Sequence, residues 1–168
     1  MPPDASAEPA PSRTLITSAA EYAAALIRLI DAAREELRFF DPDGRQLDLN
    51  APARIAALER FVAGGPHRRI RLAVHDTEHL TRDCPRFLEL LRLHAERIAV
   101  NRTEGDAARA QDCFLIADRL HCVRRPVARQ PRGVLIIDDT HEVAAQGERF
   151  EEIWASSAGA VTGTTLGL

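Results

Sequence analysis

The order of hydrophobic and polar positions predicts one α/β (mixed α+β) domain over residues 15–157. Apolar residues at helical spacing predict helices capped by Ser18 and Asn50, and a third helix over about 83–93. Alternating or continuous apolar runs predict three strands, at 36–40, 69–75 and 96–100. Because strands that alternate with helices usually pair in parallel, these elements should form the centre of the sheet.

The pattern changes in the second half of the chain, where strands follow one another closely. Short apolar runs predict strands at 113–117, 120–123 and 134–137. The first two are separated only by Asp118 and Arg119, which indicates a tight hairpin. Asp139 and Glu142 form a capping box for a last helix. The fold expected is therefore a central mixed β-sheet flanked by helices, with a late antiparallel hairpin and a C-terminal helix.

The two ends of the chain have a different composition. Residues 1–13 are rich in Pro, Ala and Ser and are predicted to be a disordered N-terminal tail, and residues 158–168 a flexible C-terminal tail. The start lacks a basic and apolar leader pattern, and no run of about 18 apolar residues occurs, so a cytoplasmic protein without a membrane segment is expected. Its three cysteines are then expected to be reduced.

The charged residues narrow the chemistry. The formal net charge of -3 argues against a general nucleic-acid-binding surface. All 22 basic residues are arginine, because the sequence contains no lysine. Schiff-base chemistry, pyridoxal-phosphate attachment and a P-loop lysine are thereby excluded, and no cofactor is expected.

One short segment has the spacing of a phosphodiesterase motif, H-x-K-x-x-x-x-D. Gln111 stands at the position of the histidine, Cys113 at the position of the lysine, and Asp118 at the position of the aspartate. The amide of Gln111 is uncharged and a poor nucleophile, and no base is evident beside Cys113. Asp118 has a second interpretation, because aspartate is also a favoured residue of hairpin turns.

These features together resemble one half-domain of the phospholipase D superfamily, over about residues 20–156, as found in its uncharacterised bacterial groups. The resemblance depends on the element order, the 111–118 spacing and the ending 150–156, with Phe150 and Trp154 on one helix face. In that family the histidine is the nucleophile, the lysine neutralises the phosphoryl charge, and two halves build one site. The family's Gly-Ser-x-x-Asn element is not matched by 125–129.

The resemblance implies a catalytically inactive phospholipase D-like domain that acts as a binding or scaffolding module, with a phosphate-bearing ligand as the candidate. It also implies a homodimer or pairing with another half-domain. No catalytic residue is assigned. The alternative is a divergent phosphodiesterase or nuclease that uses residual groups such as Asp118, His121 and the arginines.

Four arginines lie within residues 124–132. If Asp118 and Arg119 alone form the turn, Cys113 pairs with Arg124, and Gln111, Cys113, Cys122 and Arg124 share one face of the hairpin. Because arginine binds phosphate through two parallel hydrogen bonds, this segment could hold an anion. The candidate anion-binding residues are Arg124, Arg125 and Arg129. Two other interpretations are a solvated loop and a nucleic-acid-binding adaptor through 124–132.

The remaining histidines and cysteines do not predict a metal site. His75, His79 and Cys84 are ligand types, but their spacing lacks a zinc signature, so a loop at a strand end is favoured. Alternation places His121 on the opposite face from Cys122, which favours core cysteines over a metal site or a Cys-His pair.

Overall fold

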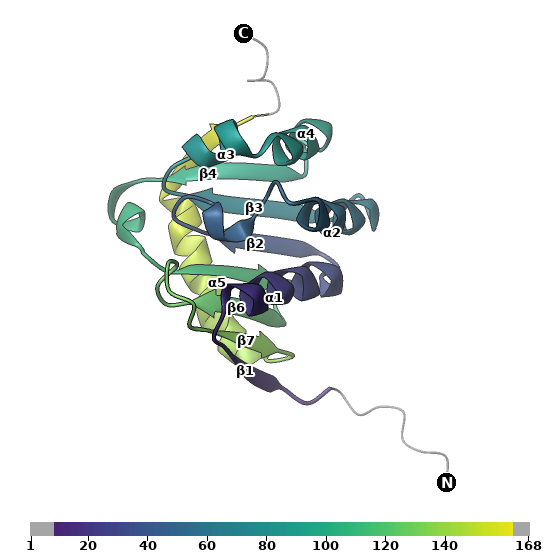
Figure 1. Cartoon of the computed structure of the whole chain (residues 1–168), viewed down its shortest axis with the longest axis vertical. Helices are drawn as coiled ribbons and strands as arrows, with labels where there is room; N and C mark the ends of the chain where they lie inside the picture. Colours follow the sequence, from purple (N-terminus) through teal and green to yellow (C-terminus); the bar gives the residue numbers. More distant parts are fainter. Residues whose placement is uncertain (1–8, 163–168) are drawn as a thin grey trace.

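The computed structural model describes residues 9–162, which form one mixed eight-stranded sheet with helices on both faces (Figure 1). The strands are β1 (Ser12–Ile16), β2 (Glu36–Phe40), β3 (Arg69–Val74), β4 (Ile98–Thr103), β5 (Cys113–Ala117), β6 (His121–Arg125), β7 (Gly133–Ile137) and β8 (Ser157–Val161). The helices are α1 (Ala19–Ala32), α2 (Pro52–Ala63), α3 (Glu78–Asp83), α4 (Pro85–Leu93) and α5 (Thr140–Ala155), with short 3₁₀ turns η1 (Arg45–Leu47) and η2 (Gly105–Arg109).

The sheet order is β1-β7-β6-β5-β2-β3-β4-β8. Strands β2, β3 and β4 are parallel to one another, and all other neighbours are antiparallel. The predicted fold class, a mixed sheet with a parallel centre and an antiparallel hairpin, is thus confirmed. None of the helices within residues 9–162 combines the length and the hydrophobicity that a bilayer-spanning helix needs.

Two hydrophobic cores lie on opposite faces of the sheet. The larger one is formed by the buried faces of α1, α2 and α4 packed on the sheet, and it includes Leu26, Leu58 and Phe87. The smaller one lies under α5 and includes Phe150 and Ile153. Alternation along β5 divides its residues between the two cores, with Cys113 in the larger and Phe114 in the smaller.

Helix ends follow the predicted caps in two of three cases. The Ser18 hydroxyl accepts from the Glu21 N–H (3.1 Å), and the Asp139 carboxylate accepts from the Glu142 N–H (2.9 Å), as expected. The prediction for Asn50 is wrong, because α2 begins after Ala51 with Pro52 in its first turn. The Asn50 side chain instead accepts from the Arg86 N–H at the start of α4 (3.2 Å).

Several element boundaries differ from the predicted ones. The helix expected over 83–93 is two helices, because Pro85 cannot continue a helix through its own nitrogen and starts α4. The strand expected at 96–100 is β4, which lies two to three residues later. The strand expected at 120–123 is β6, which starts one residue later and extends to Arg125.

The ordered fold extends into both segments that were predicted to be tails. Strand β1 starts at Ser12 and pairs antiparallel with β7, so residues 12 and 13 are not disordered. Strand β8 pairs antiparallel with β4, so residues 158–161 are not a free tail. Both strands are short and mostly exposed, and the partner strand supplies the hydrogen bonds that keep them in place. Residues 1–8 and 163–168 of the predicted tails lie outside the described residues.

The predicted pairing of the β5–β6 hairpin is wrong by one residue. Cys113 pairs with Arg125, and Phe114 pairs with Arg124. The connecting turn has three residues, 118–120, and Asp118 adopts a left-handed conformation (φ 56°), whereas the prediction assumed a two-residue turn. Because a shift of one residue exchanges the two faces of a strand, Arg124 lies on the α5 face and Arg125 on the α1 face.

Candidate functional site

The candidate site lies at the end of the sheet where the parallel strands β2, β3 and β4 finish and β5 begins. Figure 1 shows the loops that follow β2, β4 and β6 together at this edge, on the left of the view. In open α/β sheets, the carboxyl ends of parallel strands are the usual location of ligand sites. Gln111, just before β5, belongs to this edge.

Cys113 is buried and points into the core beneath α1. Its sulfur lies 3.3 Å from the hydroxyl oxygen of Tyr22, which is also buried. Burial raises the pKa of the Cys113 thiol to about 12, so it is protonated at neutral pH. A protonated thiol inside a core is not a nucleophile. Cys113 therefore does not replace the cation that the motif places at this position, and it does not offer an alternative attacking group.

The buried positions of the cysteines lead to a labelling prediction. Cys84, Cys113 and Cys122 are all free and buried, and burial raises the pKa of each thiol. In native protein we expect no thiol to react with 5,5′-dithiobis(2-nitrobenzoate) within minutes, and all three to react in 6 M guanidinium chloride. The absorbance at 412 nm measures this. A fast reacting thiol in native protein would contradict the core positions.

Gln111 is exposed and lies on the wall of a small pocket. The pocket has a volume of about 280 Å³ and lies between the loop after β2 and the loop after β6. Its lining residues are Pro42, Asp43, Arg45, Gln46, Gln111, Val127, Ala128 and Arg129. The Gln111 carbonyl accepts from the Ala128 N–H (2.8 Å), which joins the two walls at this point. We refer to this cavity as the Gln111 pocket.

Arg125 is buried directly behind the Gln111 pocket. One terminal nitrogen of its guanidinium donates to the Gln46 side-chain oxygen (3.1 Å) and to the Ala128 carbonyl (3.4 Å), and both acceptor residues line the pocket. The guanidinium also lies 4.1 Å from the centre of the Tyr22 ring. Its other terminal nitrogen donates to the Ser18 carbonyl (3.4 Å). Within residues 9–162 it forms no ion pair with a carboxylate, and its Nε has no hydrogen-bond partner. Such a buried, uncompensated cation favours an anion nearby.

Asp41 is the second buried charged group near this edge. Its Oδ1 accepts from the N–H groups of Asp43 (3.1 Å) and Gly44 (2.6 Å), which shapes the turn after β2. Its Oδ2 is buried without a partner among the described residues. Burial raises the pKa of Asp41 to about 7, against 3.8 for an ordinary aspartate, so its carboxyl is partly protonated near neutral pH.

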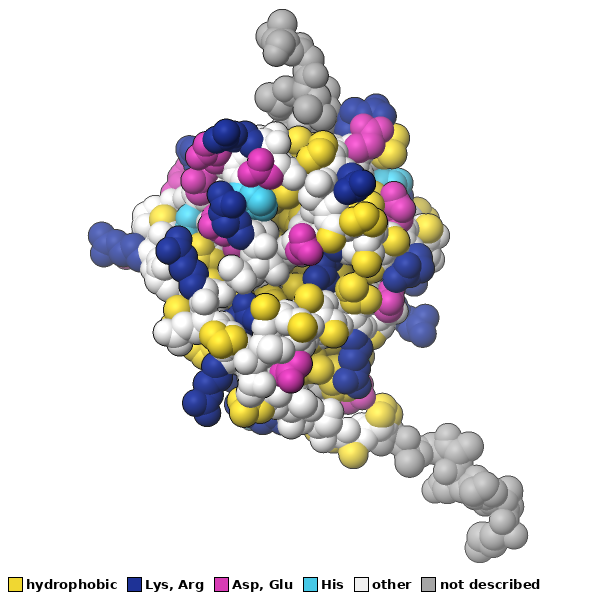
Figure 2. Space-filling view, in the orientation of Figure 1, with side chains coloured by type: hydrophobic (Ala, Val, Ile, Leu, Met, Phe, Trp, Pro, Cys, Tyr) yellow, Lys and Arg dark blue, Asp and Glu magenta, His cyan; other side chains and the backbone are white. Residues whose placement is uncertain are grey.

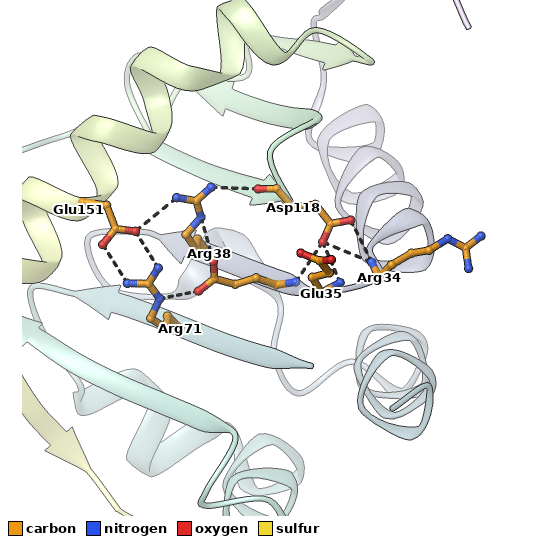
Figure 3. A network of polar contacts seen from close by, with 7 residues as sticks. Arg34, Glu35, Arg38, Arg71, Asp118 and Glu151 are labelled. Carbon is orange, nitrogen blue, oxygen red and sulfur yellow. Dashed lines mark hydrogen bonds and ion pairs between the residues drawn. The ribbon is translucent and has the colours of Figure 1, made fainter. Parts of the chain in front are cut away.

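Asp118 lies at the other end of the hairpin. Figure 3 shows its carboxylate at the loop between α1 and β2, where it accepts from the backbone N–H groups of Arg34 (3.0 Å), Glu35 (2.9 Å) and Glu36 (3.0 Å). Its carbonyl accepts from the Arg38 guanidinium (2.9 Å). A strand of five residues spans about 13 Å, so Asp118 and Gln111 occupy opposite ends of β5. In this structure Asp118 connects the hairpin turn to the α1–β2 loop.

Arg38 belongs to an ionic network that holds α5 against the sheet (Figure 3). Arg38 and Arg71 are neighbours on β2 and β3, and both contact Glu151 of α5, at 3.3 and 2.7 Å. The Arg71 guanidinium also lies 5.1 Å from the centre of the Phe150 ring. Phe150 stacks on Trp154 at 5.7 Å, which agrees with their predicted position on one helix face.

The three candidate anion-binding arginines do not form one site, although Arg124 and Arg125 both line a cavity between β1 and α5. Arg125 is buried behind the Gln111 pocket, and Arg129 is exposed on its rim. Arg124 lies on the α5 face, where it contacts Gln146 (3.4 Å) and Glu142 (3.6 Å). The predicted shared face is therefore wrong: Cys113 points towards α1, whereas Cys122 lies in the core under α5.

Two of the candidate histidines, His75 and His121, are engaged in local contacts. His75, at the end of β3, contacts the Thr103 hydroxyl (2.5 Å) and the Ala110 carbonyl (2.6 Å) through its two ring nitrogens. His121 accepts from the Asp138 N–H (3.1 Å) at the same end of the hairpin as Asp118. Over residues 9–162, no group of three or more metal-ligating side chains comes together.

The amino-acid sequence matches the model of a protein family described as a domain of unknown function, DUF7931, over residues 18–162. The chain belongs to this family. The DUF7931 match extends from the cap of α1 to the residue after β8 and so includes the whole candidate site. The search of curated proteins found no match for this DUF7931 chain.

Solved structures show which fold this DUF7931 domain has. Nuc from Salmonella typhimurium, a phospholipase D family member, matches with a TM-score of 0.67 at 12% identity, over 91% of this chain and 100% of Nuc. NucT from Helicobacter pylori matches with a TM-score of 0.58 at 14% identity, over 90% of this chain and 100% of NucT. TrmBL2, an archaeal chromatin protein, matches with a TM-score of 0.65 at 15% identity, over 93% of this chain and 56% of TrmBL2. The phospholipase D-like fold expected from the sequence is confirmed.

Two residues of the site escaped the sequence-based reasoning. Neither Asp41 nor Gln46 was among the candidate residues identified from the sequence. The segment 41–44, Asp-Pro-Asp-Gly, at the end of an apolar strand was the available signal for Asp41, because a strand end is where a polar group meets the ligand edge. The burial of Arg125 had no local signal, since it depends on Tyr22 from a distant helix.

Proposed function

We propose that this chain is a phospholipase D-fold binding module that holds a phosphate-bearing ligand in the Gln111 pocket without cleaving it. The observation that carries the proposal is the buried Arg125 guanidinium, which has no carboxylate partner and donates to two residues of the pocket wall. Arg45 and Arg129 add two exposed cations at the rim, of which Arg45 is paired with Asp43. Together these groups make the pocket a site for an anion.

Several features support binding without hydrolysis. The position of the family's nucleophilic histidine is occupied by Gln111, whose amide cannot form a phospho-enzyme. The position of the lysine is occupied by Cys113, which is buried, and the chain has no lysine to substitute for it. Asp118 and His121, the residual groups of a divergent nuclease, lie at the opposite end of the hairpin from the Gln111 pocket and are engaged in backbone contacts.

The test is a titration of the protein with pyrophosphate by isothermal calorimetry, together with an assay on bis-(4-nitrophenyl) phosphate. We expect binding, a loss of affinity of at least fivefold in Arg129→Ala, and release of nitrophenol no faster than in buffer. Arg92→Ala is the matched control, because Arg92 is an exposed arginine of α4 paired with Glu89. Equal affinity in Arg129→Ala and wild type would refute the site, and turnover proportional to protein concentration would refute the inactive module.

A nucleic-acid-binding adaptor is the second candidate. It is favoured by the similar fold of TrmBL2, an archaeal chromatin protein whose structure shows a mode of DNA binding. The arginines of 124–132 would then contact phosphates, although the hairpin separates Arg124 from Arg125 and Arg129. The homodimer, or the pairing with another half-domain, that the phospholipase D resemblance implies stays a prediction.

A further inference from the structure

A second arginine-lined cavity lies on the other face of the sheet, between the edge strand β1 and α5. Its volume is about 550 Å³. Five arginines line it: Arg13 of β1, Arg124 and Arg125 of β6, Arg132 of the β6–β7 loop and Arg149 of α5. The guanidinium of Arg125 donates to Gln46 and Ala128 of the Gln111 pocket, so the groove's own cations are the other four. We refer to it as the arginine groove. Figure 2 shows the opposite face of the molecule, where cationic and anionic side chains are interspersed without a comparable concentration of one sign.

The arginines of the groove are only partly neutralised. Arg149 forms two hydrogen bonds with Asp112, at 2.6 and 3.0 Å. Arg13 and Arg124 share a single carboxylate, that of Glu142. Arg132 forms no ion pair with any residue in 9–162. Leaving out Arg125, the other four arginines and the carboxylates of Asp112 and Glu142 give a local charge of about +2, in a chain whose net charge is -3. The groove is therefore a local positive region.

Many hydrogen-bond donors of these arginines also remain unused. A guanidinium has five N–H donors. The single carboxylate of Glu142 therefore cannot satisfy all the donors of both Arg13 and Arg124. The Arg124 side chain makes one contact to Gln146 and one to Glu142. The remaining donors are available to an anion with several oxygen atoms at more than one point along the groove.

We propose that the arginine groove binds the phosphodiester backbone of single-stranded nucleic acid. Successive phosphates along a strand match cations that are distributed over β1, β6, the loop and α5, whereas one small anion would contact only part of them. Leu15, with 56% of its surface exposed, and Pro126 provide apolar contacts for sugars beside the arginines. No aromatic residue lines the groove, so bases do not stack there, and the binding is independent of sequence.

The groove and the Gln111 pocket are separate cavities that share one neighbouring residue, Arg125. Arg129 lines the pocket and Arg132 lines the groove, on either side of the β6–β7 loop. The two sites can therefore be changed one at a time. Arg132 is the most useful position for a variant, because it lines the groove and forms no ion pair within the described residues.

The experiment measures the fluorescence anisotropy of a labelled 20-nucleotide oligothymidylate with the full chain. At 20 mM NaCl we expect binding in the micromolar range, weakened at least tenfold at 200 mM NaCl. Arg132→Ala should reduce the affinity about fivefold and the salt slope by about one, and Arg13→Ala with Arg132→Ala should abolish binding. Arg92→Ala on α4, on the other face, should bind as wild type.

Three outcomes would overturn the proposal: no binding at 20 mM NaCl, wild-type binding by the Arg13→Ala and Arg132→Ala double variant, or displacement of the oligonucleotide by poly-glutamate at equal charge. The last outcome would assign the groove to an acidic polypeptide. Pyrophosphate titration of Arg132→Ala keeps the two sites separate, because its affinity should equal that of wild type whether or not the oligonucleotide binds. Failure of the groove and failure of the Gln111 pocket are thus distinguishable.

Discussion

Replacing Asp118 with alanine is expected to lower the free energy of unfolding by about 3 kcal/mol. The Asp118 carboxylate accepts from three consecutive backbone N–H groups, those of Arg34, Glu35 and Glu36. In the variant these N–H donors lose a charged acceptor, and only the donors near the surface can form a hydrogen bond to water in its place. Alanine also fits the left-handed conformation of residue 118 (φ 56°) less well than aspartate does. Urea unfolding followed by circular dichroism measures the change.

Asp138→Ala is the matched control for this experiment. Asp138 has almost the same backbone conformation (φ 55°), but its carboxylate accepts no backbone N–H in the described structure and lies 3.8 Å from Nδ1 of His121. Asp138→Ala should lower the free energy of unfolding by only about 1 kcal/mol, because alanine fits the left-handed backbone conformation less well than aspartate does. Asp118→Asn should fall between the two, since the amide oxygen keeps an acceptor without the charge. An Asp118→Ala variant as stable as Asp138→Ala would contradict the structural role assigned to the carboxylate.

Replacing Asp41 with asparagine is expected to change how stability depends on pH. The pKa of Asp41 is about 7 in the folded protein against 3.8 for an ordinary aspartate, because the carboxyl is buried. The folded state therefore binds this proton more tightly than the unfolded state. The contribution of Asp41 to stability is complete below pH 4, declines as the pH rises, and is lost above pH 7. Asparagine keeps the acceptor for the Asp43 and Gly44 N–H groups and has no proton to lose.

The free energy of unfolding of Asp41→Asn minus that of wild type should therefore increase by about 3 kcal/mol between pH 4 and pH 8. Urea unfolding curves of both proteins at four pH values give this difference. Glu89, Glu96 and Glu151, whose pKa values are lowered by arginine partners or backbone hydrogen bonds, act at acidic pH but are common to both proteins and cancel. A difference that is constant over this range would show that Asp41 is not protonated in the folded state.

The parts of the fold that could be predicted from the sequence depend on neighbouring residues. Ser18 and Asp139 cap their helices through contacts three residues away, so their residue types and spacing were sufficient. The central strands are apolar enough to be recognised whatever they pair with. Asn50 shows the limit of this reasoning. It is a residue type that often caps helices, but the helix begins two residues later, at Pro52.

The site depended on a register that local rules did not determine. The turn after β5 was expected to have two residues, but the Asp118 carboxylate holds a three-residue turn by binding the α1–β2 loop, which is more than 80 residues away in the sequence. That one extra residue sends Arg125 beneath α1 and Arg124 beneath α5. The arginine cluster was therefore found, but its division into two sites could not be.

The outermost strands also determine when the sheet can be completed during synthesis. The partner of β1 is β7, which is synthesised about 120 residues later. The outer partner of β4 is β8, at 157–161. Before β7 is complete at Ile137, strand β1 has no partner in the nascent chain. Before β8 is complete at Val161, one edge of β4 is unpaired. Such long-range closure slows folding. Until β7 and β8 have been made, the edges of β1 and β4 are therefore open to association with other chains.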